Sequence, residues 1–158
     1  MTARLRSILK PEQLQALGQI TADFQVLEET ISSFILDLIG AEPDVGEIIT
    51  SELSFRKLID LLSALFKHQV RNDTKIAEME RLVLRANVVE QKRNTIIHSG
   101  WALGNTDETI TRVKTTAKQR HGLRVQSVEM DTVMLKQIAD EIAELSADLS
   151  DFHRTLHS

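Results

Sequence analysis

Apolar residues recur at three- and four-residue steps along four stretches of the chain, a spacing that places them on one face of an α-helix. Pro11 suits the first turn of the first helix, and Gly40 suits its end. Ser54 and Asp131 stand where the N-caps of later helices are expected. The pattern predicts amphipathic helices over residues 11–40, 54–70, 74–98 and 131–152, with a short helical turn at 45–51.

Residues 107–130 follow a different pattern, because threonines and β-branched residues there recur roughly at every second position. Two such runs, 108–118 and 122–130, flank the sequence QRHG, which is typical of a turn. We therefore expect a β-hairpin in this segment. The whole pattern predicts an all-α fold class: an up-down four-helix bundle with a small β-hairpin inserted before the last helix, in a single domain over residues 1–158.

The composition excludes several classes of protein. A length of 158 residues suits one domain, and the absence of cysteine excludes disulfides, thiolate zinc sites and cysteine nucleophiles. No apolar run approaches the roughly 18 residues that a membrane helix needs. The opening sequence MTARLRSILKPEQ lacks the apolar core of a secretion signal. We expect a cytoplasmic protein without membrane association, and we expect neither a cofactor nor a metal site.

The 19 basic and 23 acidic residues give a net charge of −4, which argues against a protein that coats nucleic acid over its whole surface. The charge is uneven. Residues 109–127 hold five basic residues and no acid, so the rest of the chain carries 14 − 23 = −9. This segment is a candidate for contact with a polyanion, and a solvated turn region is the alternative. Its basic residues are Arg112, Lys114, Lys118, Arg120 and Arg124.

The segment from Glu90 to Trp101 brings polar residues onto the apolar face of the third predicted helix. At 100° per residue, Arg93 falls inside the apolar stripe and Glu90 on its edge, while Asn94 and His98 flank it. Because a buried, unpaired guanidinium is costly, Arg93 needs a partner or must face a cleft. One interpretation is structural: Glu90 pairs with Arg93, and Asn94 and His98 hold the helix end.

The motif Arg93-Asn94-x-x-x-His98 resembles the signature of HEPN domains (higher eukaryotes and prokaryotes nucleotide-binding), which lies late in a long helix of a four-helix bundle. The Ser-Gly-Trp that follows is similar to the sequence that ends this helix in many such proteins. The specific likeness covers six residues, and the order of helices extends it over most of the chain. The resemblance implies a metal-independent endoribonuclease, of a type common among toxins and abortive-infection effectors, whose two motifs face each other in a dimer.

In such a nuclease the ribose 2′-OH attacks the adjacent phosphate while one group removes a proton and another supplies one. His98 is suited to acid or base, Arg93 to binding phosphate, and Asn94 to orienting either group. One imidazole cannot be acid and base at once, so we expect a homodimer that contributes two copies of His98. The predicted substrate-binding set consists of Arg112, Lys114, Lys118 and Arg120 of the hairpin, with Trp101 stacking on a base. Glu90 is a supporting residue.

Some HEPN toxins carry a tyrosine two residues after the histidine, which a partner antitoxin modifies. That position is Gly100 here and the chain has no tyrosine, so this mode of inactivation is excluded. RNA, a second copy of the chain and an antitoxin or other protein are the expected partners. Two alternative functions stay open: a catalytically inactive helical module that binds a protein, and a nucleotide sensor that uses the same residues.

Other residues carry weaker signals. His121 in the predicted turn, and His153 with His157 near the end of the sequence, are candidates for phosphate or metal contact. Solvated side chains and a frayed helix end are the simpler explanations for them. Lys57 and Asp60 of the second predicted helix are candidates for supporting the site from across the bundle. A core position is the simpler explanation for the lone tryptophan.

Overall fold

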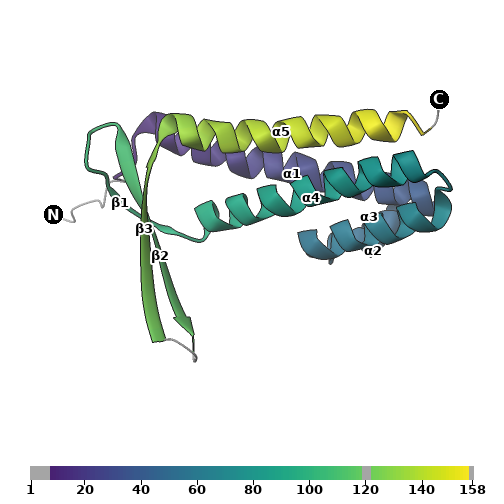
Figure 1. Ribbon diagram of the computed structural model, residues 1–158, viewed down its shortest axis with the longest axis horizontal. Coiled ribbons are helices and arrows are strands. Elements are labelled where there is room, and N and C mark those ends of the chain that lie inside the picture. Colours follow the sequence, from purple (N-terminus) through teal and green to yellow (C-terminus); the bar gives the residue numbers. More distant parts are fainter. Residues whose placement is uncertain (1–7, 119–121, 157–158) are drawn as a thin grey trace.

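The computed structural model describes residues 8–118 and 122–156, which form five helices and three strands (Figure 1). The four long helices lie within two residues of their predicted stretches. The predicted all-α fold class is nevertheless wrong, because a fifth helix and a three-stranded antiparallel sheet accompany them. In chain order the elements are α1 (Pro11–Ile39), α2 (Pro43–Ser51), α3 (Phe55–Gln69), α4 (Asp73–Ile97), β1 (Gly100–Leu103), β2 (Thr109–Lys118), β3 (Gly122–Asp131) and α5 (Thr132–Arg154).

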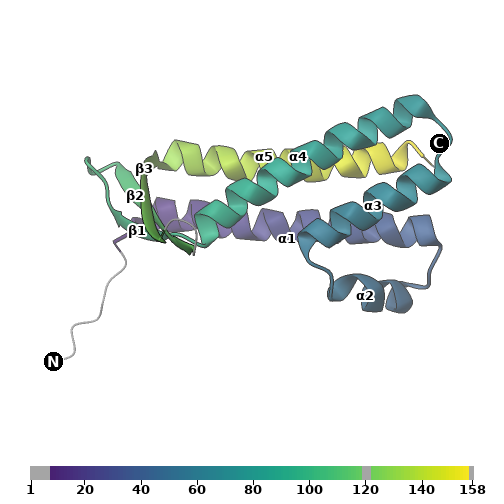
Figure 2. The ribbon, with the colours of Figure 1, turned by 60° about the horizontal axis from the view of Figure 1, so that its bottom comes forward.

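Helices α1 and α5 lie side by side over most of their lengths and run in the same direction (Figures 1 and 2). Their apolar positions recur at three- and four-residue steps and are buried from one end of the pair to the other. Thr30 and Ser146 hydrogen-bond across the interface, with 2.9 Å between their hydroxyl oxygens. The buried side chains of this pair include Ile20, Leu27, Ile31, Phe34, Leu135, Ile142, Leu145 and Leu149.

The long helices do not alternate in direction, so the predicted up-down order is wrong. Helix α2 and its flanking loops lead the chain from the end of α1 back to its middle, and α3 then runs in the same direction as α1 (Figure 2). Phe55, the first residue of α3, packs on Phe24 of α1 with ring centroids 4.6 Å apart. Phe66 packs against Phe34 further along, at 6.1 Å. Helix α3 therefore covers α1 only from about Phe24 onward.

The predicted hairpin is present, but it is the larger part of a sheet. Strands β2 and β3 pair over ten residues each, and β1 pairs with the other edge of β2. The sequence GWALGN, which follows the end of the third long helix, contributes β1. At the base of the hairpin Ile110 and Met130 pair across the strands and are buried in the helical core. The outer half of the hairpin extends away from the helices (Figure 1).

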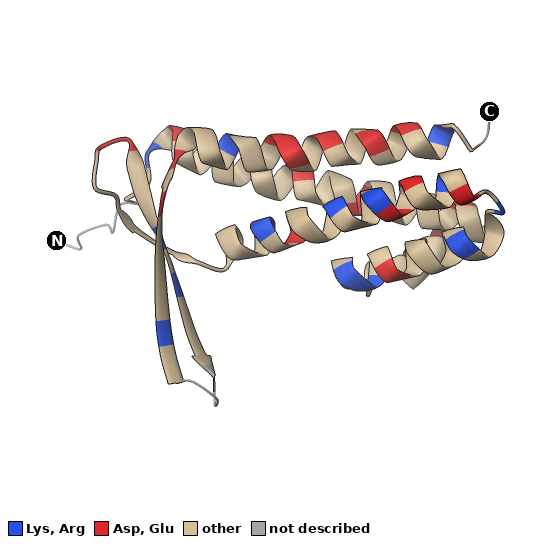
Figure 3. Ribbon diagram, in the orientation of Figure 1, with Lys and Arg blue, Asp and Glu red and all other residues tan. Residues whose placement is uncertain are grey.

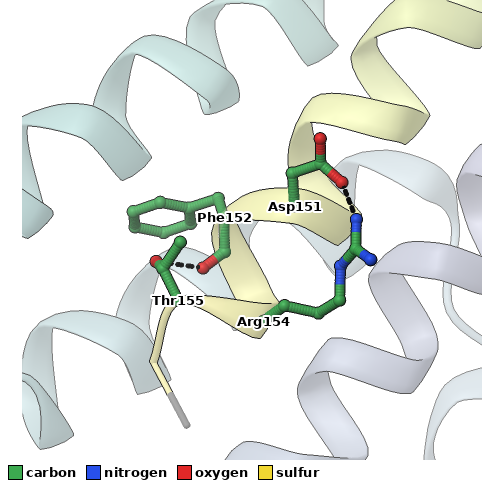
Figure 4. A network of polar contacts seen from close by, with 4 residues as sticks. All are labelled: Asp151, Phe152, Arg154 and Thr155. Atoms are coloured by element: carbon green, nitrogen blue, oxygen red, sulfur yellow. Dashed lines mark hydrogen bonds and ion pairs between the residues drawn. The ribbon is translucent and has the colours of Figure 1, made fainter. Parts of the chain in front are cut away.

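Local polar contacts close the C-terminal end of α5 (Figure 4). The Thr155 hydroxyl donates to the carbonyl oxygen of Phe152 at 2.6 Å, and Arg154 pairs with Asp151 one turn earlier. The Phe152 ring is buried, with its centroid 5.5 Å from that of Phe66 in α3. The last turn of α5 is thus anchored to α3 by a ring contact and finished by hydrogen bonds that its own residues supply.

Two helical glycines offer a test of this packing. At Gly46 in α2, an added Cβ would lie 2.6 Å from both Cδ atoms of Leu36, so Gly46→Ala is expected to destabilise the fold by about 1–3 kcal/mol. At Gly18 on the exposed side of α1 an added Cβ meets nothing within 4 Å, so Gly18→Ala is expected to stabilise by about 0.5–1 kcal/mol. Urea unfolding of the two variants measures both values. Equal effects of the two substitutions would contradict the packing of α2 on α1.

Candidate functional site

The residues of the Arg-Asn-x-x-x-His motif lie at the C-terminal end of α4, where the helix meets the sheet (Figure 1). His98 is the C-cap residue, and its backbone N–H donates to the carbonyl oxygen of Asn94 at 3.2 Å. Its side chain is exposed, whereas those of Arg93 and Asn94 are half-buried. The structure therefore brings the three predicted catalytic residues to one end of one helix, with the imidazole in solvent and the guanidinium inside the helix interface.

The guanidinium of Arg93 occupies the interface between α4 and α1. Its Nη1 donates to Asn94 Oδ1 at 3.0 Å, and its central carbon lies 4.9 Å from the centre of the Phe24 ring. Such a cation–π contact holds a guanidinium without using its N–H donors. Arg93 Nε is buried and has no hydrogen-bond partner. The side chain is thus positioned by a ring and an amide, while part of its donor capacity goes unused.

The carboxylate partner expected for Arg93 is not where the sequence pattern predicted it. In the described part of the chain no ion pair forms between Glu90 and Arg93. Glu28 of α1 instead responds to both residues. Burial raises the pKa of Glu28, the positive charge of Arg93 opposes this rise, and the negative charge of Glu90 adds to it. Two carboxylates and one guanidinium therefore influence one another across the α1–α4 interface.

Glu28 is a site residue that the sequence reasoning missed, although a signal for it exists. On a helical wheel Leu14, Leu17, Phe24 and Glu28 share one side of α1, at three- and four-residue steps. A carboxylate in line with apolar residues needs an explanation, as does a guanidinium in line with them on another helix. Opposite charges that interrupt the apolar faces of two helices are natural partners, and this rule applied to the sequence links Glu28 to Arg93.

The described basic residues of residues 109–127 share one face of the sheet. Arg112 and Lys114 alternate along β2, and Arg124 lies on β3 opposite Thr116. Since directly paired residues of antiparallel strands point to the same side, these three side chains lie on a common face. No acid interrupts the hairpin between residues 109 and 127, as the colouring of Figure 3 also shows for its outer half. The Lys118 side chain and Arg120 lie outside the described residues.

The basic side chains of this face, and Trp101 beside them, differ in exposure. Arg124 is exposed and Lys114 half-buried, so both can be reached from solvent. Arg112 is only 8% exposed, and its Nη1 donates to the hydroxyl of Ser99 at 3.3 Å. Trp101, paired with Arg112 across β1 and β2, is half-buried and packs against the helical core. The outer hairpin is therefore available to a ligand, whereas Arg112 and Trp101 belong to its base.

The weaker candidates are placed apart from the α4 end. His153 Nε2 lies 3.0 Å from Asp37 Oδ2, and its ring stacks on Phe34 at 4.1 Å between centroids. Lys57 and Asp60 are exposed on α3. His121 and His157 lie outside the described residues. Among the residues that the structure describes, no group of three histidine or acidic side chains is arranged to hold a metal ion, and no helix is long and apolar enough to cross a bilayer.

Comparisons of the chain with protein-family models, with curated proteins and with solved structures yield no match. The case for a site at the end of α4 consequently rests on the residues themselves: a guanidinium with an unused buried donor, an exposed imidazole one turn later, and a basic hairpin attached to the same end of the helix.

The raised pKa of Glu28 makes a prediction about stability. Below the unfolded pKa of about 4.3 the carboxyl is protonated in both states, so its ionisation does not affect the free energy of unfolding. As the pH rises from there through the folded pKa, the unfolded protein ionises first and the folded state is destabilised. Glu28→Gln is therefore expected to raise Tm at about pH 7 and to leave it unchanged at about pH 4.

Glu29→Gln is the matched control, because Glu29 is the exposed neighbour on the same helix. Thermal unfolding of both variants at the two pH values gives the comparison. A lower Tm for Glu28→Gln at neutral pH would mean that the attraction of Glu28 to Arg93 exceeds the cost of burying its charge, contrary to this prediction.

Proposed function

We propose that this protein is a metal-independent endoribonuclease that works as a homodimer, with Arg93, Asn94 and His98 in its active site. The observation that carries the proposal is the state of Arg93. Its guanidinium is fixed by Asn94 and the Phe24 ring, keeps a buried donor without a partner among the described residues, and belongs to a residue five positions before the exposed His98. A cation held in this way is suited to steadying the charge of a phosphate under attack.

The proposed reaction needs two proton transfers. The 2′-oxygen of a ribose bonds to the neighbouring phosphorus and gives its proton to one His98 imidazole. The bond from phosphorus to the 5′-oxygen breaks, and that oxygen receives a proton from the other His98, which is protonated. The products are a 2′,3′-cyclic phosphate and a 5′-hydroxyl. A two-fold dimer supplies both imidazoles and two copies of Arg93 in one cleft, and this requirement is the physical reason for the second copy.

Two features support a dimer at this end of the molecule. Helix α3 begins only at the level of Phe24, so the first part of α1 lacks its cover. Leu14 on α1 is 46% exposed and Ile97 at the end of α4 is 37% exposed. Apolar side chains left beside a charged motif suit contact with a second copy, because burying them is favourable by about 25 cal/mol per Å².

The basic face of the hairpin suits the RNA backbone. Lys114 and Arg124 lie on one side of a projecting arm without acids, and each is free to neutralise a phosphate. The rest of the chain carries 14 − 23 = −9 and repels nucleic acid, so attraction concentrates at the arm. This arrangement favours binding of a limited length of RNA next to the end of α4.

A second candidate function has its own observation. All the contacts made by Arg93 in the described structure are internal, to Phe24, Asn94 and the charge of Glu28, which is the pattern of a residue that holds two helices together. A catalytically inactive helical interaction module accounts for this equally well. In that case Arg93→Ala costs several kcal/mol of stability, whereas His98→Ala costs nothing in any assay.

The first test of the nuclease is RNA cleavage in the presence of EDTA by the wild type, His98→Ala and His68→Ala. His68 is also exposed, but it lies at the far end of α3. We expect His98→Ala to lose at least about 100-fold in rate, because general acid–base catalysis contributes about that much or more. His68→Ala should cut like the wild type and yield 2′,3′-cyclic phosphate ends.

Unfolding temperatures of the two variants should equal that of the wild type, since both side chains are exposed. Cleavage by His98→Ala at the rate of the wild type, or no cleavage by the wild type of structured and unstructured RNAs, would contradict the nuclease and favour the interaction module.

The hairpin makes a separate prediction about binding. In a His98→Ala background, Lys114→Gln and Arg124→Gln are each expected to weaken binding of single-stranded RNA and to reduce the slope of log K against log salt concentration by about 0.7. Lys136→Gln, on the exposed side of α5, is the control and should leave the slope unchanged. Fluorescence anisotropy over a range of salt concentrations measures the slopes. Slopes unaffected by either hairpin substitution would show that RNA does not contact this face.

A further inference from the structure

A cavity of about 350 Å³ opens between α4, the hairpin and α5, at the same end of α4 as the proposed active site. Its apolar lining includes Val88 of α4, Val128 of β3 and Ile138 of α5, while Gln91, Lys92, Thr95 and Arg112 supply its polar groups. Val88 is half exposed, so the cavity is open to solvent on that side. The volume lies within the range of small-molecule sites, which combine apolar walls with a few fixed polar groups.

Arg112 places a positive charge in this cavity. It lies in the middle strand, and the register pairs it with Trp101 on one side and Val128 on the other, so its stem is enclosed by the sheet. The residue is 8% exposed. Among the described residues its side chain hydrogen-bonds only to the neutral hydroxyl of Ser99, at 3.3 Å, and makes no ion pair. A buried guanidinium without a counter-ion is costly.

The remaining charges at the cavity cancel each other. Lys92 also lines it, but its ammonium forms an ion pair with Glu141 of α5. The cavity therefore has a net charge of one, from Arg112 alone. A single negative charge balances it. A carboxylate carries that charge and can pair with the two parallel donors of a guanidinium, whereas a dianionic phosphate would leave one negative charge unbalanced.

We propose that the cavity between α4, the hairpin and α5 binds a small monocarboxylate with an aliphatic body, whose carboxylate pairs with Arg112 and whose chain lies along Val88, Val128 and Ile138. This site is distinct from the proposed nuclease site. The cavity residues Val88, Gln91, Lys92 and Thr95 follow one another at steps of one to four on one side of α4. At 100° per residue Arg93 falls on the opposite side of α4, whereas His98 lies within about 20° of Gln91, at the edge of the cavity side.

Octanoate, octanamide and acetate are the probes, and binding to the full chain is followed by calorimetry and by NMR of the backbone amides. Octanamide has the body without the charge, and acetate has the charge without the body. We expect saturable binding of octanoate, with affinities for octanamide and acetate that are lower by at least about tenfold. Amide shifts should concentrate in α4 from Val88 to Ile96 and in β3.

Variants test the residues. Arg112→Gln is expected to lower octanoate affinity by at least about tenfold, whereas Lys114→Gln, the next residue on the same face of β2, should bind octanoate like the wild type. Val88→Glu places a carboxylate at the exposed rim of the cavity and should also abolish binding. Because Val88 is half exposed, this variant is expected to fold. It therefore tests the site even if Arg112→Gln fails to fold.

Equal affinities for octanoate and octanamide, octanoate binding unchanged in Val88→Glu, or no binding of octanoate at millimolar concentration would each overturn the proposal. None of these measurements involves RNA. Failure of the nuclease assay and failure of this site are therefore separate results.

Discussion

The packing of α1 against α5 is the constraint on which the rest of the structure depends. The two helices are 29 and 23 residues long, and their apolar stripes face each other throughout. Each fully buried leucine, isoleucine or phenylalanine contributes about 1.5–3 kcal/mol, so this interface is a large part of the favourable free energy of folding. The hydrogen bond between Thr30 and Ser146 satisfies two hydroxyls within it. The other helices and the sheet are arranged around this pair.

The shortness of α3 determines where polar groups are tolerated. Helix α3 begins at the level of Phe24, and at this level the guanidinium of Arg93 lies between α1 and α4, with its charge near a ring, an amide and the carboxylate of Glu28. If α3 also covered this part of the α1–α4 interface, Arg93, Glu28 and Glu90 would lose more of their contact with water. The free energy needed to desolvate their charges would then be much larger. The position of the candidate site thus follows from a helix that begins late.

The sequence predicted elements better than their arrangement. The four long helices were predicted correctly because apolar periodicity reports which face of a segment is buried, and the hairpin because threonine-rich alternation is local. Periodicity contains no information on direction, so the return of the chain through α2 was missed and an up-down bundle was expected. Strand β1 was missed because four residues with two glycines nearby are typical of a loop, and its extended conformation depends on pairing with residues 110–113 of β2. Glu28 was missed because its relation to Arg93 joins two helices far apart in the chain. The endoribonuclease activity, the homodimer and the RNA contacts of the hairpin stay predictions.

Arg93 and Arg112 pose the same physical problem on opposite sides of the last turns of α4. Each is a guanidinium with little access to solvent, and neither forms an ion pair within the described structure. The chain does not lack acids, since outside residues 109–127 it has nine more acids than bases. Many of those acids lie along the long helices (Figure 3). A carboxylate beside a buried guanidinium, or an apolar residue in its place, stabilises a fold: Arg93 has the carboxylate of Glu28 across the α1–α4 interface, whereas Arg112 has the hydroxyl of Ser99. The charge of Glu28 partly balances Arg93, so among the described residues the stronger need for an anion from outside the chain is at Arg112, whose side chain bonds only to a neutral hydroxyl.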